Sequence, residues 1–236
     1  MTKLAERHWH EFATPDALAA SFSARIGKVL SEAVESRGTG LLAVSGGKTP
    51  VKLFQALARI TIPWEKVTIT LVDERFVPPS SVRSNERLAR QNLLHHEAAK
   101  AHFVGLYHPA PAIEEAAKKA RTAVAGFPYP FDLVVLGMGD DGHTASFFPD
   151  ATTLPTLLDP KGQETILPVH AVSAVEPRLT FSLPRLVAGR HLALHIEGEE
   201  KKATLETAFA GTGDHPMPIR SIFEHAGKPV DVFWAP

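Results

Sequence analysis

Residues 131–149 read FDLVVLGMGDDGHTASFFP, and this stretch decides how the fold is interpreted. Four consecutive apolar residues, 133–136, are flanked by turn formers, a pattern typical of a short buried strand in a parallel sheet. Three glycines follow within six residues and allow the backbone to turn sharply and approach a ligand closely. Ligands of open α/β sheets bind at the carboxyl ends of such strands. The stretch therefore predicts an α/β fold whose functional edge carries His143.

Two aspartates, Asp140 and Asp141, precede His143 in the glycine-rich loop. An imidazole beside a carboxylate suits a general base, because the carboxylate can orient the ring and fix its tautomer. A tight turn with a surface histidine would give the same local pattern. The rest of the chain has to decide between these two interpretations.

Strands and helices are expected to alternate along the chain. This alternation predicts one α/β domain over residues 1–236, with a mainly parallel sheet flanked by helices. Residues 183–187 are expected to form a turn. Strands are expected at 41–44, 67–72, 103–106, 133–136, 178–182, 191–196 and 230–234, and helices at 15–36, 51–59, 85–94, 111–125 and 199–209.

Composition excludes several kinds of protein. The formal net charge is −1 with no basic block, so neither nucleic acid nor an acidic membrane surface has electrostatic support as a partner. The absence of cysteine excludes disulfides, thiolate metal sites and cysteine nucleophiles. No segment approaches the roughly 18 apolar residues of a membrane span. We expect a cytoplasmic monomer that acts on a small molecule.

Polar groups follow three other expected strands. Small residues at 45–50, SGGKTP, leave backbone N–H groups free to bind an anion, although a plain tight connection would look the same. Asp73 and Arg75 could bind a substrate hydroxyl and a phosphate, or form a surface ion-pair cluster. Lys201 lies in the first turn of an expected helix, although a solvated helix face would also explain this lysine, and Arg178 is a fourth candidate cation.

The order of these pieces resembles that of the 6-phosphogluconolactonase family, which is related to the glucosamine-6-phosphate deaminase/isomerase group. The resemblance extends from about residue 41 to residue 206. It implies a modified Rossmann-like fold, as in the sugar-phosphate isomerase/deaminase superfamily. The matching pieces are LAVSGGKTP, VDERFVP, SNERLAR, LVVLGMGDDGHTASFFP, PRLTFSLPRL and HIEGEEKKATLE.

The resemblance also implies the site residues. His143 corresponds to the family's general base, and Asp141 to the carboxylate that orients it. Asp73 falls at the sugar end of the site, and Asn85 is a further member. Lys48 departs from the family, in which a small hydroxyl residue is frequent, and would contact phosphate only if its side chain points inward. The phosphate pocket is expected to comprise Ser45, Gly46, Gly47, Lys48, Arg75, Arg178 and Lys201, the last in preference to Lys202.

The implied activity is hydrolysis of 6-phospho-D-glucono-1,5-lactone to 6-phosphogluconate, in the oxidative pentose phosphate pathway, with no metal and no cofactor. Two alternatives are a glucosamine-6-phosphate deaminase/isomerase-like enzyme and a non-catalytic sugar-phosphate sensor. Deaminases carry a catalytic glutamate where this chain has Phe148, and a tyrosine where it has Arg75. Both differences favour the lactonase.

Overall fold

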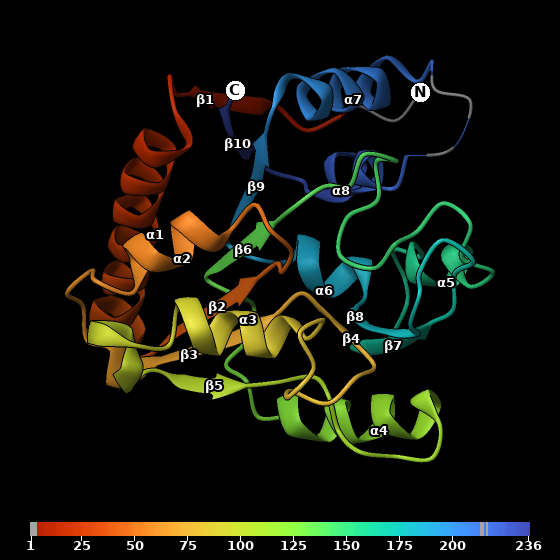
Figure 1. Cartoon of the computed structure of the whole chain (residues 1–236), viewed down its shortest axis with the longest axis horizontal. Helices are drawn as coiled ribbons and strands as arrows, with labels where there is room; N and C mark the ends of the chain where they lie inside the picture. The colour runs from red at the N-terminus through yellow and green to blue at the C-terminus, as the bar shows by residue number, and fades with distance from the viewer. Residues whose placement is uncertain (1–3, 213–214, 216) are drawn as a thin grey trace.

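A seven-stranded parallel sheet forms the centre of the protein, seen in a computed structural model that describes residues 4–212, 215 and 217–236 (Figure 1). Every adjacent pair of its strands is parallel, which confirms the predicted sheet type. In spatial order its strands are β1 (Arg7–Glu11), β10 (Val230–Ala235), β9 (His191–Glu197), β6 (Leu133–Leu136), β2 (Gly40–Val44), β3 (Val67–Leu71) and β5 (His102–Val104).

Helices cover both faces of this sheet. Figure 1 shows α1 and α2 on one side and α6 and α8 on the other. None of the described helices is long and apolar enough to cross a bilayer. The α-helices are α1 (Pro15–Arg37), α2 (Val51–Leu57), α3 (Asn85–Asn92), α4 (Ile113–Val124), α5 (Leu154–Leu157), α6 (Leu183–Val187), α7 (Glu199–Ala210) and α8 (Ile219–His225), with 3₁₀ turns at Trp64–Lys66 and His96–Lys100.

Local sequence sets the limits of α1 as predicted. Thr14 is the N-cap, and its hydroxyl accepts the N–H of Ala17 at 3.2 Å, while Pro15 takes the first helical position. The helix ends at Gly38, which adopts a φ of +78°, a conformation that glycine reaches without steric cost. Between these ends a row of apolar side chains packs against the sheet: Leu18, Phe22, Ile26, Val29, Leu30 and Ala33.

A second, antiparallel sheet of three strands lies beside the first. Its strands are β4 (Asp73–Arg75), β8 (Arg178–Phe181) and β7 (Ile166–Val169), in that order. The strand predicted at 178–182 is β8, but it belongs to this sheet and not to the parallel one. Because only Val72 separates β4 from β3, the chain passes directly from one sheet to the other, which a strand pattern read along the sequence does not reveal.

Some elements differ from the sequence prediction. The turn predicted at 183–187 is wrong, because Pro184 stands in the first turn of a helix, α6, where its missing N–H costs nothing. β1, β7, α5 and α8 were not predicted. β1 reads RHWHE and lies at the edge of the sheet, so it needs no apolar run, and Pro168 interrupts the strand pattern of β7.

Candidate active site

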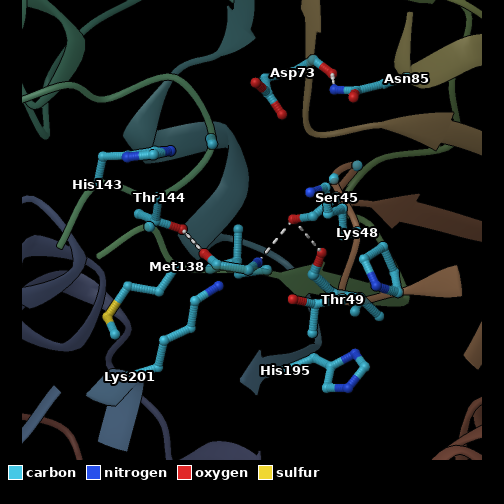
Figure 2. Close-up of a pocket in the computed structure, with 18 of the residues that line it drawn as sticks. Ser45, Lys48, Thr49, Asp73, Asn85, Met138, His143, Thr144, His195 and Lys201 are labelled. Atoms are coloured by element: carbon cyan, nitrogen blue, oxygen red, sulfur yellow. Dashed lines mark hydrogen bonds between the residues drawn. The ribbon is translucent and has the colours of Figure 1, made fainter. Parts of the chain in front are cut away.

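Four loops at the carboxyl edge of the parallel sheet surround a cavity of about 190 Å³ (Figure 2). They follow β9, β6, β2 and β3, which are neighbours in the sheet, so the loops meet at one place. The predicted site residues that line the cavity are Ser45, Gly46, Gly47, Lys48, Asp73, Arg75, Asn85, His143, Arg178 and Lys201.

His143 and Asp141 form a close pair beside this cavity. The Nδ1 of His143 lies 2.6 Å from Oδ1 of Asp141, and the backbone N–H of His143 donates to the same oxygen at 3.0 Å. Burial raises the pKa of Asp141, but the hydrogen bonds and the charge of His143 together lower it by more. The pKa of Asp141 therefore lies below its usual range. With Nδ1–H donating to the carboxylate, Nε2 is the basic nitrogen of the neutral ring.

Two glycines of the loop allow His143 to take this position. A Cβ atom on Gly139 would lie 2.2 Å from Cε1 of His143, so any side chain there would displace the imidazole. Gly142 has a φ of +76°, which side chains with a Cβ atom rarely adopt. The glycine spacing noticed in the sequence thus has two separate physical reasons.

Ser45 ties the loop after β2 to the loop after β6. Its hydroxyl donates to the carbonyl of Val135 at 3.0 Å and accepts the N–H of Gly137 at 2.8 Å, as the dashed lines in Figure 2 show. Because its one proton is already donated, the hydroxyl has none to offer a phosphate oxygen. The sequence placed Ser45 among the phosphate-binding residues, and its geometry instead favours a role in holding the two loops together.

The loop that follows Ser45 presents backbone groups to the cavity. Within the described part of the chain, the N–H groups of Gly46 and Gly47 form no hydrogen bond with the protein. Gly47 has a φ of +91°, and a Cβ on Gly46 would lie 2.0 Å from Oδ1 of Asn85. Lys48 lines the cavity with an exposed side chain. Free N–H groups of this kind favour an anion.

Two arginines come together through the small sheet. β4 and β8 place Arg75 directly opposite Arg178, so the two side chains share one face of the sheet. An Nη1 atom of Arg178 lies 4.0 Å from Oδ2 of Asp73, which also accepts the hydroxyl of Ser146 at 2.5 Å. Burial lowers the pKa of Arg178, and the charge of Asp73 acts in the opposite direction. The predicted cations and the sugar-end aspartate are thus neighbours.

Glu74, between Asp73 and Arg75, is fully buried on the other face of β4. Its carboxylate accepts the backbone N–H groups of Arg75, Asn85 and Glu86 and the hydroxyl of Ser84, at 2.7–3.0 Å. Burial raises the pKa of Glu74 above its usual value, although these hydrogen bonds lower it. This network fixes the start of α3, where Asn85 donates from Nδ2 to the carbonyl of Asp73 at 2.9 Å.

Lys201 and its neighbour Lys202 have different surroundings. Lys201 lines the cavity, and Figure 2 shows its side chain directed into it. Lys202 donates to Glu11 at 2.8 Å, outside the cavity. Among the described residues, no three His, Asp or Glu side chains gather as they would around a metal ion.

Comparison with known proteins identifies the family. The family profile described as glucosamine-6-phosphate isomerases/6-phosphogluconolactonase matches residues 13–234. The chain belongs to this family. A 6-phosphogluconolactonase of Mesorhizobium japonicum is 52% identical over 98% of this chain and 97% of its own length. One from Rhizobium meliloti is 48% identical, over 96% and 98%. The crystal structure of a 6-phosphogluconolactonase from Shewanella baltica has a TM-score of 0.94 and 40% identity, with complete coverage of both chains.

Phe148 occupies the position at which the deaminases of this family carry a catalytic glutamate. Its ring packs on His143 with centroids 4.4 Å apart, and the guanidinium carbon of Arg178 lies 5.3 Å from its centroid. A phenyl ring transfers no proton, so this position supplies packing next to the base and no second acid or base.

Sequence reasoning missed several residues that shape this family site. Ser146 holds Asp73, Glu74 holds the start of α3, and Thr144 donates to the carbonyl of Gly137 at 2.8 Å. His195 is buried on β9 and lines the cavity, with Nε2 at 3.2 Å from Glu197. A histidine inside an apolar strand was the one available signal, and the other three look like ordinary loop or turn residues.

Proposed function

We propose that this chain hydrolyses 6-phospho-D-glucono-1,5-lactone to 6-phosphogluconate, with His143 as the general base. The observation that carries this proposal is the His143–Asp141 pair, which stands beside a cavity also lined by Arg75, Arg178 and Lys201. Hydrolysis of a phosphorylated lactone requires a base that activates water. It also requires cations that bind the phosphate. Relatives at 42–52% identity carry the name 6-phosphogluconolactonase.

The reaction needs one proton carrier. Nε2 of neutral His143 takes a proton from water as the water oxygen bonds to C1 of the lactone. The tetrahedral intermediate then collapses, the bond from C1 to the ring oxygen breaks, and the imidazolium returns its proton to that oxygen. Asp141 keeps Nδ1 protonated and stabilises the imidazolium. General acid–base catalysis of this kind contributes about 10²–10⁴-fold to the rate.

The oxyanion of this intermediate requires a hydrogen-bond donor near His143. In the glycine loop, the N–H of Gly137 donates to Ser45, that of Gly139 to the carbonyl of His143, and that of Gly142 to the carbonyl of Gly139. The N–H of Met138 has no such acceptor among the described residues, and Met138 lines the cavity. We assign the oxyanion to this group.

The phosphate would bind among the cationic side chains and free N–H groups that line the cavity. The free N–H groups of Gly46 and Gly47 and the side chains of Arg75, Arg178 and Lys201 supply the donors, with Lys48 at the exposed margin. Asp73 and Asn85 would contact sugar hydroxyls between the two ends, and Oδ1 of Asn85 is buried without a protein partner in the described structure. Binding this remote anion positions C1 beside the base.

The remaining expectations accompany this function. We propose that residues 1–236 act as one domain, as a monomer in the cytoplasm, without nucleic acid or a cofactor. The deaminase alternative is not favoured, because Phe148 packs on the base where a carboxylate would be needed. A sugar-phosphate sensor would not need the His143–Asp141 pair, and that alternative is not favoured either.

The test is the decay of freshly prepared 6-phosphogluconolactone. The purified protein should accelerate this decay above its spontaneous rate without added metal, and His143→Ala should lower kcat by about 10²–10⁴-fold. Affinity for 6-phosphogluconate should change little, because the base does not hold the phosphate. An unchanged kcat in His143→Ala would remove this residue from the base role. His102→Ala, an exposed histidine of β5, serves as the control.

A further inference from the structure

The turn that carries Lys201 is held from outside the cavity by the last strand of the sheet. Gly198, the N-cap of α7, donates its N–H to the carbonyl of Ala235 at 2.8 Å. The carbonyl of Gly198 accepts the indole N–H of Trp234 at 3.0 Å. Both hydrogen-bonding groups of this residue therefore contact β10, and its carbonyl also accepts the backbone N–H of Lys202 at 3.3 Å.

Lys202 adds a second contact between the same elements. Its ammonium lies 3.8 Å from the centroid of the Trp234 ring and 2.8 Å from a carboxylate oxygen of Glu11. Trp9 of β1 stands on the same side, with its ring centroid 5.5 Å from this ammonium. Figure 1 shows α7 beside β1 and β10, at the edge of the sheet. A cation over an indole face is attracted to it, and most strongly when water is excluded.

The conformation of Gly198 explains why the contacts from β10 matter. Its φ is +91°, and a Cβ atom added there would meet nothing within 4 Å, so the turn itself, and not crowding, requires glycine. An isolated glycine has many conformations open to it. The contacts from β10 select one of them and thereby fix the direction in which α7 starts.

Lys201 lies three residues after Gly198, in the first turn of α7. The direction of the first turn sets where its Cα lies and hence where its long side chain can reach. A lysine ammonium is a point charge on a flexible stem, so its interaction with an anion depends on how well the backbone places it. Lys202, the next residue of the same turn, contacts Trp234 and Glu11 outside the cavity.

We propose that Trp234 is a positioning residue that orients the β9–α7 turn so that Lys201 reaches the phosphate of the substrate. The proposal rests on the phosphate-binding role assigned to Lys201 under the proposed function. It gives the two adjacent lysines separate tasks, one toward the ligand and one toward the indole. Trp234 itself would touch neither the substrate nor the base.

The test compares Trp234→Phe with Trp9→Phe. Trp234→Phe removes the indole N–H that Gly198 accepts and keeps an aromatic ring, whereas Trp9 makes no hydrogen bond to that turn in the described structure. Inhibition constants are measured for 6-phosphogluconate and for gluconate, which lacks the phosphate. Loss of one neutral hydrogen bond predicts about 3–10-fold weaker inhibition by 6-phosphogluconate in Trp234→Phe. Gluconate inhibition and kcat should change less than twofold, and Trp9→Phe should behave as wild type.

A double variant separates positioning from general destabilisation. In a Lys201→Ala background, Trp234→Phe should not weaken inhibition by 6-phosphogluconate any further, because Trp234 acts only through the contact of Lys201 with the phosphate. Equal loss for both ligands, or fully additive effects of the two substitutions, would overturn the proposal. If Lys201→Ala alone shows no phosphate-dependent loss, the phosphate role of Lys201 fails first, and the role of Trp234 fails with it.

Discussion

The half of the cavity that holds the base and the half assigned to the phosphate are built in different ways. Gly139, Asp141, His143 and Phe148 lie within ten residues of one another on the loop after β6. The cationic half brings together segments from β2, β4, β8 and α7, which are far apart in the sequence. One half is a local motif, and the other exists only when both sheets are in place.

This difference predicts which substitutions affect catalysis alone and which affect folding as well. A substitution in the loop after β6 should alter the chemistry and little else. A substitution that loosens β4 should affect folding and phosphate binding together, because the same backbone carries both.

Glu74→Gln should cause the largest loss of stability. Each carboxylate oxygen accepts two donors, so an amide nitrogen in either orientation faces two donors and leaves buried N–H or O–H groups unpaired. The free energy of unfolding should fall by about 2–4 kcal/mol, measured by urea denaturation. Glu65→Gln, on the surface, is the control. A loss below about 0.5 kcal/mol would mean that the start of α3 does not depend on this carboxylate.

Arg178→Met should weaken phosphate binding and leave the base in place. Loss of a charge-assisted contact to phosphate predicts a decrease in kcat/KM of about 10–100-fold for the phosphorylated lactone. Plain glucono-1,5-lactone should lose less than threefold. Arg185→Met, whose guanidinium lies over Tyr129 and away from the cavity, is the matched control. Equal losses on the two substrates would show that Arg178 does not hold phosphate.

Asp141→Asn should lower kcat about tenfold, since a partly exposed charged hydrogen bond orients the imidazole. The lowered pKa of Asp141 adds a test by pH. A carboxylate whose folded pKa is depressed stabilises the protein above its unfolded pKa, and this contribution disappears as pH falls through the folded value. Wild type should therefore exceed the variant in unfolding free energy at neutral pH, by no more than about 1 kcal/mol given the exposure of the side chain. A difference that grows toward acid pH would contradict this sign.

Ala145→Gly should have the smallest effect. Ala145 lies two residues after the base with a φ of +49°, a region that costs residues with a Cβ atom about 1 kcal/mol. Glycine removes that strain and adds chain entropy to the unfolded state, so the two effects partly cancel. Stability should rise by less than about 1 kcal/mol in thermal or chemical unfolding. A loss larger than this would mean that the methyl group contributes to packing.

The same contrast explains what the sequence could predict. His143, Asp141 and the glycines form one contiguous pattern, so their proximity followed from the sequence. Pairing of Arg75 with Arg178 depends on the second sheet, whose β7 strand contains Pro168 and was not predicted. Glu74 and Ser146 gain their importance from burial, which depends on the complete fold. Trp234 is part of an expected strand, but only the structure shows its bond to Gly198.

The most direct test of the account is a crystal structure with bound 6-phosphogluconate. We expect the C1 carboxylate within hydrogen-bonding distance of Nε2 of His143, and the phosphate among Gly46, Gly47, Arg178 and Lys201. A ligand bound in the reverse direction, or with C1 beyond reach of the imidazole, would contradict the claim that this residue activates water at the lactone carbon.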